Sequence, residues 1–380
     1  MSLKSIKTAK LKGKRVLLRL DLNSAIEKGR IKNFERLNAS IKTLKYLKKK
    51  NAITVILSHQ SRPGKKDFTS LKKHAEYLNK KIKVKFVNDV FGNKALEAIQ
   101  SLKPGEILLL DNVRMIKEEF RPNAEYTKKL AKYCDIYVND AFSVCHRNHA
   151  SVVDFPRLLP SYIGLNLEYE LKSLSKIKLK NSVFILGGAK PEDTIKLVGK
   201  AKTLVGGLLA HISLAANKYE LGKDNAIVKK YSKLIPAVKS KLNKIMLPID
   251  VAILKNNKRV NLSVDCLPTK HKIYDIGKET IKIYIKEIKK AKSIYVKGPL
   301  GMYEDKRFAL GTKLIFNAVA SSKAFSVIGG GDTVAALDKF RINKNKIGYI
   351  SLSGGALLTY LARKKLPGLE ALKTTNYINK

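Results

Sequence analysis

The chain is 380 residues long, and its 76 Lys and Arg against 31 Asp and Glu give a formal net charge of +45 at pH 7. The hydrophobic fraction of 44% excludes a disordered protein, and no apolar run approaches the roughly 18–20 residues of a membrane-spanning helix. A chain of this length predicts two domains rather than one.

The cysteine content and the net charge bound the location and the partners. Three cysteines cannot form a disulfide framework, and the basic N-terminal stretch lacks the apolar segment of a secretory signal, so we expect a cytoplasmic protein. The charge allows two interpretations, nucleic-acid binding or a compositional bias toward Lys, Ile and Asn. Because the lysines are spread along the whole chain, we expect neither a specific nucleic-acid partner nor a membrane.

Apolar runs of strand length alternate with amphipathic helical stretches through the first half. In the first helical stretch, Leu37, Ile41 and Leu44 recur at helical spacing. This alternation predicts a parallel sheet covered by helices on both faces. The predicted strands are Arg15–Leu22, Ala52–Leu57, Val84–Val87, Ile107–Leu110 and Ile136–Asn139. The predicted helices are Asn33–Lys50, Thr69–Asn79, Asn93–Leu102 and Pro122–Tyr133.

The alternation is interrupted between residues 158 and 179, where Ile163–Leu174 has the pattern of a helix. It then resumes, and the polar stretch Asn256–His271 is expected to form a hairpin or a loop. We therefore expect an α/β fold of two doubly wound parallel-sheet (Rossmann-like) domains, 1–162 and 181–365, joined by a hinge helix in 163–180. The strands predicted in the second half are Val183–Leu186, Thr203–Val205, Lys244–Leu247, Ser293–Val296, Ala324–Ile328 and Ile347–Ser351.

Charged and polar side chains follow the predicted strands of the first half. Ligands of open parallel sheets bind beyond the carboxyl ends of the strands, and arginine binds phosphate and carboxylate through a bidentate fork. A single Arg in such a place is usually a surface ion-pair partner, but its recurrence at equivalent positions favours a small, strongly anionic ligand. The candidates are Asp21, Asn23, Arg36, His59, Arg62, Arg114 and Arg147, with Asp140, His146 and His149 near them.

Glycines take the corresponding places in the second half. Ala324–Phe340 combines an apolar run, three glycines and a helical pattern, a geometry that presents backbone N–H groups and a helix dipole to an anion. Asp332 adds an oxygen ligand suited to Mg²⁺ bound to phosphate. Such turns are also ordinary connectors. Together the two halves have the layout of a phosphoryl-transfer enzyme. The glycines are Gly187, Gly188, Gly206, Gly207, Gly298, Gly301, Gly329, Gly330, Gly331, Gly354 and Gly355.

Other motifs are weak or absent. Cys145, His146 and His149 are spaced like metal ligands, but no second pair sits at zinc spacing. The GxxxxGK[ST] phosphate loop is missing. The three glycines of 329–331 do not complete GxGxxG, so a dinucleotide site is weakly supported.

Eleven motifs follow one another along the whole chain: RLDLNS, NFERLNASI, SHQSRP, LLLDNVR, VNDAFSVCHRNHAS, LGGAKPED, LPIDVAI, YDIGKETI, GPLGMYE, FSVIGGGDT and SLSGGA. In sequence, order and spacing they resemble those of the phosphoglycerate kinase family, and GGAKPED with a compact central part resembles its archaeal branch. The resemblance implies reversible, Mg²⁺-dependent transfer of the acyl phosphate of 1,3-bisphosphoglycerate to ADP, giving 3-phosphoglycerate and ATP, in glycolysis and gluconeogenesis.

The resemblance also implies roles for individual residues. Arg36 would stabilise charge on the transferring phosphoryl group, Lys190 would guide it, and Glu304 would meet the ribose. Asp332 would organise Mg²⁺. The glycerate would be held by Asp21, Asn23, Arg36, His59, Arg62, Arg114 and Arg147. The nucleotide would be held by Gly187, Gly188, Lys190, Gly207, Gly329, Gly330, Gly331, Asp332 and Thr333.

Two further expectations follow the resemblance. The domains would close about the hinge, and residues 366–380 would pack back on the first domain; we expect a monomer, with a dimer as the alternative. Four positions depart from the family pattern, and they affect nucleotide contacts more than the reaction. Thr194 replaces a lysine, Lys297 an asparagine, and Ser61 and Ser353 replace glycines.

Overall fold

The computed structural model describes residues 3–373, and the chain divides into two compact units. Unit 1 comprises Met1–Leu171 with Lys365–Lys380, and unit 2 comprises Lys172–Lys364. The division falls inside helix α7 (Leu165–Ser175). Of the predicted C-terminal segment 366–380, residues 374–380 lie outside the described residues.

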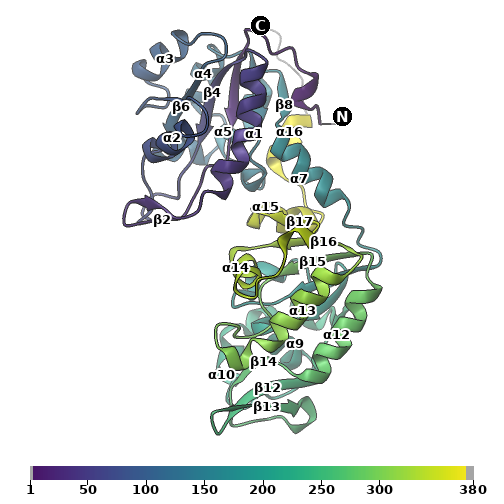
Figure 1. The fold of residues 1–380 in the computed structure, drawn as a ribbon. Helices are drawn as coiled ribbons and strands as arrows, with labels where there is room; N and C mark the ends of the chain where they lie inside the picture. Colours follow the sequence, from purple (N-terminus) through teal and green to yellow (C-terminus); the bar gives the residue numbers. More distant parts are fainter. Residues whose placement is uncertain (1–2, 374–380) are drawn as a thin grey trace. The chain divides into compact units, whose positions relative to one another are not determined.

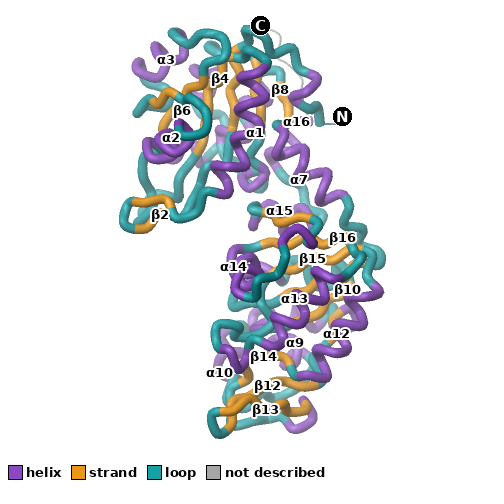
Figure 2. Tube along the Cα trace, viewed as in Figure 1, coloured by secondary structure: helices purple, strands orange, loops and turns teal. Residues whose placement is uncertain are grey.

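Unit 1 is built on a six-stranded parallel sheet in the order β5-β6-β4-β1-β7-β8. All six residues of β4 are buried, as expected for a strand covered on both faces. Helices lie around the strands in Figures 1 and 2. The strands are β1 Arg15–Arg19, β4 Ile53–Ser58, β5 Lys85–Phe86, β6 Ile107–Asn112, β7 Ile136–Asn139 and β8 Ser161–Ile163, with a separate hairpin of β2 Ile26–Glu27 and β3 Arg30–Ile31.

Helix α1 buries an apolar stripe in the core of unit 1. In α1, Leu37, Leu44 and Leu47 are fully buried in the core that also contains Val16 and Ile56. Both the sheet and the helix faces therefore follow from the apolar spacing. The helices are α1 Glu35–Lys49, α2 Lys72–Asn79, α3 Asn93–Gln100, α4 Glu125–Ala131, α5 Ala150–Val153 and α6 Phe155–Leu158.

Helix α16 (Pro367–Lys373) completes unit 1 from the far end of the sequence. The Gly368 N–H donates to the Cys145 carbonyl over 2.9 Å, and α16 packs on α5. A Cβ on Gly368 would lie 2.6 Å from Val152 Cγ1, so the close approach requires glycine.

Unit 2 contains a second six-stranded parallel sheet, ordered β11-β10-β9-β15-β16-β17, and a three-stranded antiparallel sheet, ordered β13-β12-β14. The small sheet lies at the opposite end of this unit from β17 (Figure 1). The strands are β9 Ser182–Leu186, β10 Lys202–Val205, β11 Ile245–Met246, β12 Asp250–Lys255, β13 Lys258–Ser263, β14 Ile273–Ile276, β15 Ser293–Lys297, β16 Phe325–Gly329 and β17 Tyr349–Ser351.

The helices of unit 2 enclose a core of their own. Ile281, Tyr284 and Ile288 of α12 are buried with Ile315 and Phe316 of α13, and these two helices lie side by side in Figure 1. The helices are α8 Pro191–Thr194, α9 Gly207–Ala216, α10 Asn225–Lys230, α11 Ile235–Lys239, α12 Lys278–Lys290, α13 Leu310–Ser321, α14 Gly331–Lys339 and α15 Gly354–Leu361. Within 3–373, the search for a helix with the length and apolarity of a membrane span finds none.

The predicted α/β class and the two parallel sheets are confirmed, and the differences concern strand ends, the short strand β8 and the antiparallel sheet, whose strands β12 and β14 were not predicted. Strand β1 ends at Arg19, before the predicted Leu22. The stretch Asn256–His271 contains β13, which forms a hairpin with β12. Most of β13 is exposed, so it has no apolar run that would announce a strand. Strand β8 has three residues, too few for a periodic signal.

Candidate active site

The predicted glycerate residues of unit 1 come together beyond the carboxyl ends of β1, β4, β6 and β7. Arg36 connects two of them: its Nε lies 3.2 Å from Asp21 Oδ2, and its Nη1 donates to the Asn23 carbonyl over 2.8 Å. The Asn23 side chain accepts from the Ser61 N–H over 2.7 Å, and Arg114 Nη1 donates to the Ser61 carbonyl. Loops from three strands are thereby fixed around one group of cations.

His59 lies in the middle of this group and is buried. Burial lowers the pKa of His59 well below its ordinary value, and the charges of four arginines, Arg19, Arg114, Arg36 and Arg147, lower it further. The imidazole is therefore neutral at physiological pH. Burial and neighbouring arginines likewise lower the pKa of Arg114 to about 9, and burial and Arg62 lower that of Arg147. Such mutual repulsion favours a bound polyanion.

A buried network beneath these cations was missed by the sequence reasoning. Arg19 is fully buried, and it donates to Ser151 Oγ over 2.9 Å and to the Leu20 carbonyl over 2.6 Å. Its Nη2 lies 3.2 Å from His59 Nδ1. An arginine at the end of a strand, preceded by a run of apolar residues, gives no sequence signal that separates it from an exposed one.

Glu119 supplies the counter-charge of this network. It is fully buried and accepts from Tyr126 Oη over 2.5 Å, from Ser151 Oγ over 2.7 Å and from the Ser151 N–H over 2.9 Å. Burial alone would raise its pKa, but His149, Arg19 and these donors outweigh that effect, so the pKa of Glu119 is lowered. The carboxylate is therefore ionised and supports the cationic cluster from below.

Asp140 is directed into the fold rather than toward the cationic group. Its carboxylate accepts from Thr43 Oγ1 over 2.6 Å and from the backbone N–H groups of Asn166 and Leu167 over 2.8 and 2.9 Å. Burial raises the pKa of Asp140 to about 6. These bonds satisfy the first turn of α7, so Asp140 has a structural role there.

In unit 2, main-chain atoms of glycine loops lie against one another. The Gly187 N–H donates to the Lys297 carbonyl over 2.8 Å, and the Gly188 N–H donates to the Pro299 carbonyl over 2.7 Å. A Cβ on Gly187 would lie 2.1 Å from the Pro299 oxygen, and one on Gly298 would lie 2.4 Å from the Gly187 oxygen. No side chain fits between these loops, which explains why both positions are glycine.

The turn 329–333 joins β16 to α14. Gly330 has φ +101° and is the N-cap of α14, so the first turn of the helix directs N–H groups outward without intrahelical partners. Thr333 is buried, and its hydroxyl accepts from the Gly298 N–H over 2.8 Å and donates to the Gly329 carbonyl over 2.9 Å. Its side chain thus holds the turn to the Gly298 loop.

A pocket of about 290 Å³ opens between these loops. Of the predicted nucleotide residues it is lined by Gly188, Gly207, Glu304 and Asp332. Gly187, Lys190, Gly329, Gly330, Gly331 and Thr333 do not line it; Lys190 is exposed and precedes α8. The sequence reasoning missed the apolar wall of the pocket, which consists of Leu208, Ile273, Tyr274, Pro299, Met302 and Tyr303.

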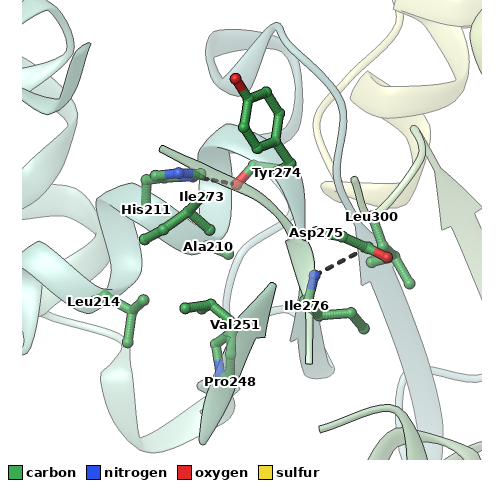
Figure 3. A pocket seen from close by; sticks show the side chains of 11 residues that line it. Ala210, His211, Leu214, Pro248, Val251, Ile273, Tyr274, Asp275, Ile276 and Leu300 are labelled. Carbon is green, nitrogen blue, oxygen red and sulfur yellow. Dashed lines mark hydrogen bonds between the residues drawn. The ribbon is translucent and has the colours of Figure 1, made fainter. Parts of the chain in front are cut away.

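His211 and Asp224 connect the walls of this pocket. His211 Nδ1 lies 2.9 Å from the Gly207 carbonyl, and its Nε2 lies 3.4 Å from Asp224 Oδ2. Asp224 also accepts from the Ile273 N–H over 2.8 Å. Figure 3 shows His211 beside Ile273 and Tyr274, above a small apolar cavity of about 20 Å³ that Leu214 and Val251 help to line. The tie holds α9 against β14.

No group of three or more His, Cys, Asp or Glu side chains within residues 3–373 is arranged to hold a metal ion. Asp332 is an exposed carboxylate in the first turn of α14. A divalent ion there would need most of its oxygen ligands from a bound phosphate and from water, the usual arrangement for Mg²⁺.

Two doubly wound domains, one with a cationic cluster and one with a glycine-walled pocket, define a phosphotransferase. The sequence profile of phosphoglycerate kinase matches residues 6–364. Phosphoglycerate kinases of Methanothermus fervidus and Methanosarcina mazei are both 41% identical to the chain, over 95% and 96% of it and 94% and 93% of their own lengths. The crystal structure of the Pyrococcus horikoshii enzyme superposes with a TM-score of 0.86 at 34% identity, covering 98% of this chain and 99% of that one.

The chain therefore belongs to the phosphoglycerate kinase family. It is a kinase that transfers a phosphoryl group between the carboxyl group of 3-phosphoglycerate and ADP or ATP.

Proposed function

We propose that the cationic cluster of unit 1 binds 1,3-bisphosphoglycerate or 3-phosphoglycerate, and that the glycine loops of unit 2 bind ADP or ATP. One observation supports this assignment of the two substrates. The unit 1 cluster consists of converging charged side chains, whereas the unit 2 loops approach one another through main-chain atoms. A small polyanion needs converging charges, and a nucleotide needs close approach of backbone to its phosphates.

In unit 1, the arginines bind the phosphate and carboxyl oxygens of the substrate. Arg36 moves from Asp21 to the transferring phosphoryl group, where it stabilises developing charge. Neutral His59 donates one hydrogen bond to the substrate without adding to the repulsion among its neighbours. The full set of substrate-binding residues is Asp21, Asn23, Arg36, His59, Arg62, Arg114 and Arg147.

In unit 2, the base and ribose occupy the 290 Å³ pocket, with Glu304 toward the ribose. The phosphates meet the N–H groups of the 329–333 turn, and Lys190 guides the transferring group. Asp332, together with phosphate oxygens, would hold Mg²⁺, which neutralises phosphate charge when it is bound. The nucleotide set is Gly187, Gly188, Lys190, Gly207, Glu304, Gly329, Gly330, Gly331, Asp332 and Thr333.

The reaction itself needs no protein nucleophile. The P–O bond to the acyl oxygen breaks, its electron pair leaves on the carboxylate of 3-phosphoglycerate, and a β-phosphate oxygen of ADP forms the new P–O bond. No proton is transferred. Because acyl phosphates hydrolyse readily, we propose that closure about residues 163–180 excludes water during transfer. We propose that the two domains comprise residues 1–162 and 181–365, and that residues 366–380 pack back on the first domain.

We further propose that the protein is a cytoplasmic enzyme of glycolysis and gluconeogenesis and that it acts as a monomer. A coupled assay of ATP formation from ADP and 1,3-bisphosphoglycerate, with and without Mg²⁺, tests the function. Turnover that requires Mg²⁺ supports it. Absence of turnover in well-folded protein contradicts it. Light scattering at several protein concentrations tests the monomer.

One surface favours a second activity, polyanion binding. An open hollow of about 560 Å³ between the ends of α1 and α2 is lined by six lysines, and none of these forms an ion pair with a carboxylate within residues 3–373. It contains no aromatic side chain for base stacking. Tight, salt-sensitive RNA binding that is lost when these lysines are changed to Gln would favour this second function. The lysines are Lys45, Lys48, Lys49, Lys80, Lys81 and Lys83.

A further inference from the structure

Lys297 occupies a central position at the end of the unit 2 sheet. It is the last residue of β15, which lies between β9 and β16, and its register partners are Leu186 and Gly329. The next residues along those partner strands are Gly187 and Gly330. A Cβ on Gly330 would lie 3.9 Å from Lys297 Cγ. The side chain of Lys297 therefore leaves the sheet beside the turn that we propose as the phosphate site.

The ammonium group of Lys297 is half-buried, and its ion pair is weak. Its side chain is 16% exposed, and its ion pair within residues 3–373 is with Asp193 Oδ2 at 3.4 Å. Asp193 is itself 54% exposed, so the pair is poorly shielded from water and contributes little. Burial lowers the pKa of Lys297, and nearby Lys190 acts in the same direction, whereas Asp193 and Asp332 oppose it.

The position is unfavourable for a cation in the absence of an anion. The N-terminus of α14 carries partial positive charge, and Lys190 adds a full one. A polar but uncharged side chain could occupy the end of β15 without this repulsion. A lysine here is favourable when a polyanion occupies the turn, since phosphate oxygens would then contact both the ammonium and the helix N–H groups.

Thr194 offers no hydroxyl to a phosphate at the turn. It is fully buried, and its hydroxyl donates to the Pro191 carbonyl over 3.2 Å, within its own helix. Lys190 is exposed and lies at the start of α8. Lys297 thus lies at the end of a central strand, whereas Lys190 belongs to the loop before α8, and its charge acts on Lys297.

We propose that Lys297 is a catalytic residue that contacts the terminal phosphate of the nucleotide and the phosphoryl group in transit, and that Asp193 holds its ammonium group while the site is empty. This inference rests on the proposed function of the unit 2 pocket. As the P–O bond to the acyl oxygen breaks and the bond to the ADP oxygen forms, Lys297 stabilises the charge on the shared phosphoryl oxygens and keeps its own protons.

The test compares Lys297→Met, Lys297→Arg, Asp193→Asn and the exposed control Lys196→Met in the full-length enzyme. For Lys297→Met we expect kcat to fall about 10²-fold, the size seen when one charge-stabilising donor is removed. The Kd of ATP, from calorimetry, should rise, and the Michaelis constant for the glycerate substrate should stay unchanged. Lys297→Arg should recover part of kcat. Asp193→Asn should bind ATP a fewfold tighter, because it removes the competing anion.

Each outcome supports or overturns the inference. If Lys297→Met behaves like Lys196→Met, or if Asp193→Asn weakens ATP binding, Lys297 does not act on the phosphate. If Lys297→Met does not fold, the Lys297→Arg and Asp193→Asn results decide the question alone. Failure of the parent enzyme to bind ATP would instead remove the proposed function of the pocket, and this inference with it.

Discussion

The two candidate sites are built from different parts of the polypeptide. In unit 1, functional groups are side chains fixed by other side chains and carbonyls, as when Arg36 is held by Asp21 and Asn23. In unit 2, the loops containing Gly187 and Gly298 touch through backbone, where a single Cβ would lie within 2.4 Å of an oxygen. One site therefore recognises charge, and the other recognises shape at close range.

The two kinds of site should also fail differently. A side chain of unit 1 can be removed while the loops remain hydrogen-bonded, so binding or catalysis is lost although the protein still folds. Gly187 and Gly298 of unit 2 cannot be replaced without displacing a neighbouring loop, so binding and folding change together.

Arg36→Ala tests the side-chain site directly. We expect kcat to fall about 10³- to 10⁵-fold, the range found when an arginine that stabilises a transferring phosphoryl group is removed. Arg36 is partly exposed at 27%, so the melting temperature should change little. Steady-state kinetics and calorimetric melting measure the two quantities. A kcat equal to that of the parent would remove Arg36 from the reaction.

Glu119→Gln tests the support of the side-chain site. The buried Arg19 would lose its counter-charge, and a carbonyl and an amide would face three donors now bound by the carboxylate. Breaking a buried ion network in this way costs about 3–5 kcal/mol. Hydrogen exchange of the β1 and β7 amides measures the loss in unit 1. An unchanged opening free energy would show that Arg19 does not depend on Glu119.

The contrast also explains how far the sequence could predict the molecule. Both parallel sheets follow from buried apolar runs such as β4, and the glycine turns and the arginines follow from their places after strands. Arg19 and Glu119 were missed because their burial depends on partners that are distant in the sequence. Ser151, which both contact, lies 132 positions after Arg19 and 32 positions after Glu119. The hairpin β12–β13 was left undecided because its second strand is exposed.

The sequence also could not show how individual departures are accommodated. Thr194 is buried, and Lys297 is half-buried beside Asp193, which lies 104 positions earlier in the sequence. The contact of Lys297 is therefore not encoded in neighbouring residues. Local pattern predicts which element a residue belongs to. Only the packing of distant segments determines which atoms it meets.

Acidification should weaken unit 1 through its neutral histidines. Burial lowers the pKa of His74 from 6.5 to about 4, and burial also lowers the pKa of His59 well below its ordinary value. Below pH 6.5 a histidine of the unfolded chain binds a proton, whereas the buried histidine of the folded chain does not. The contribution of the neutral histidine to the free energy of unfolding is therefore complete above pH 6.5 and declines as pH falls. For His74 the loss between pH 6.5 and 5 is about 2 kcal/mol.

The matched variant for this effect is His74→Gln, which keeps a donor toward Gln60 Oε1, now 3.1 Å from His74 Nε2. Hydrogen exchange at β4 should show a smaller loss between pH 6.5 and 5 in the variant than in the parent. Asp140, whose pKa burial raises to about 6, acts in the opposite direction in both proteins and cancels in the comparison. Equal pH dependence would mean that His74 is protonated in the folded state.

Gly330→Ala and Gly331→Ala test the backbone site as a pair. Gly330 has φ +101°, a conformation that costs an L-residue about 1–3 kcal/mol, whereas a Cβ on Gly331 meets nothing within 4 Å. We expect Gly330→Ala to destabilise unit 2 by that amount and to weaken ATP binding about tenfold, and Gly331→Ala to do neither. Calorimetry measures both. Similar behaviour of the two variants would show that the turn does not depend on the Gly330 conformation.

Ser61→Gly should have the smallest effect, although Ser61 lies within the unit 1 site. Its φ of +55° costs a serine about 1 kcal/mol, which glycine would relieve. Its hydroxyl donates to Asp67 Oδ1 over 2.5 Å, a bond of similar worth that glycine would lose. The two terms oppose each other, so the unfolding free energy should change by less than about 1 kcal/mol.

The contacts of Ser61 with the site explain why activity should also persist. Asn23 accepts from its N–H and Arg114 donates to its carbonyl, and both groups belong to the main chain that glycine retains. The Michaelis constant for the glycerate substrate should therefore stay within about twofold, while Asn23→Ala, which removes the acceptor, should raise it about tenfold. A large change of this constant in Ser61→Gly would show that a hydroxyl contacts the substrate, and unit 1 would then rely on Ser61 as a side chain as it does on Arg36.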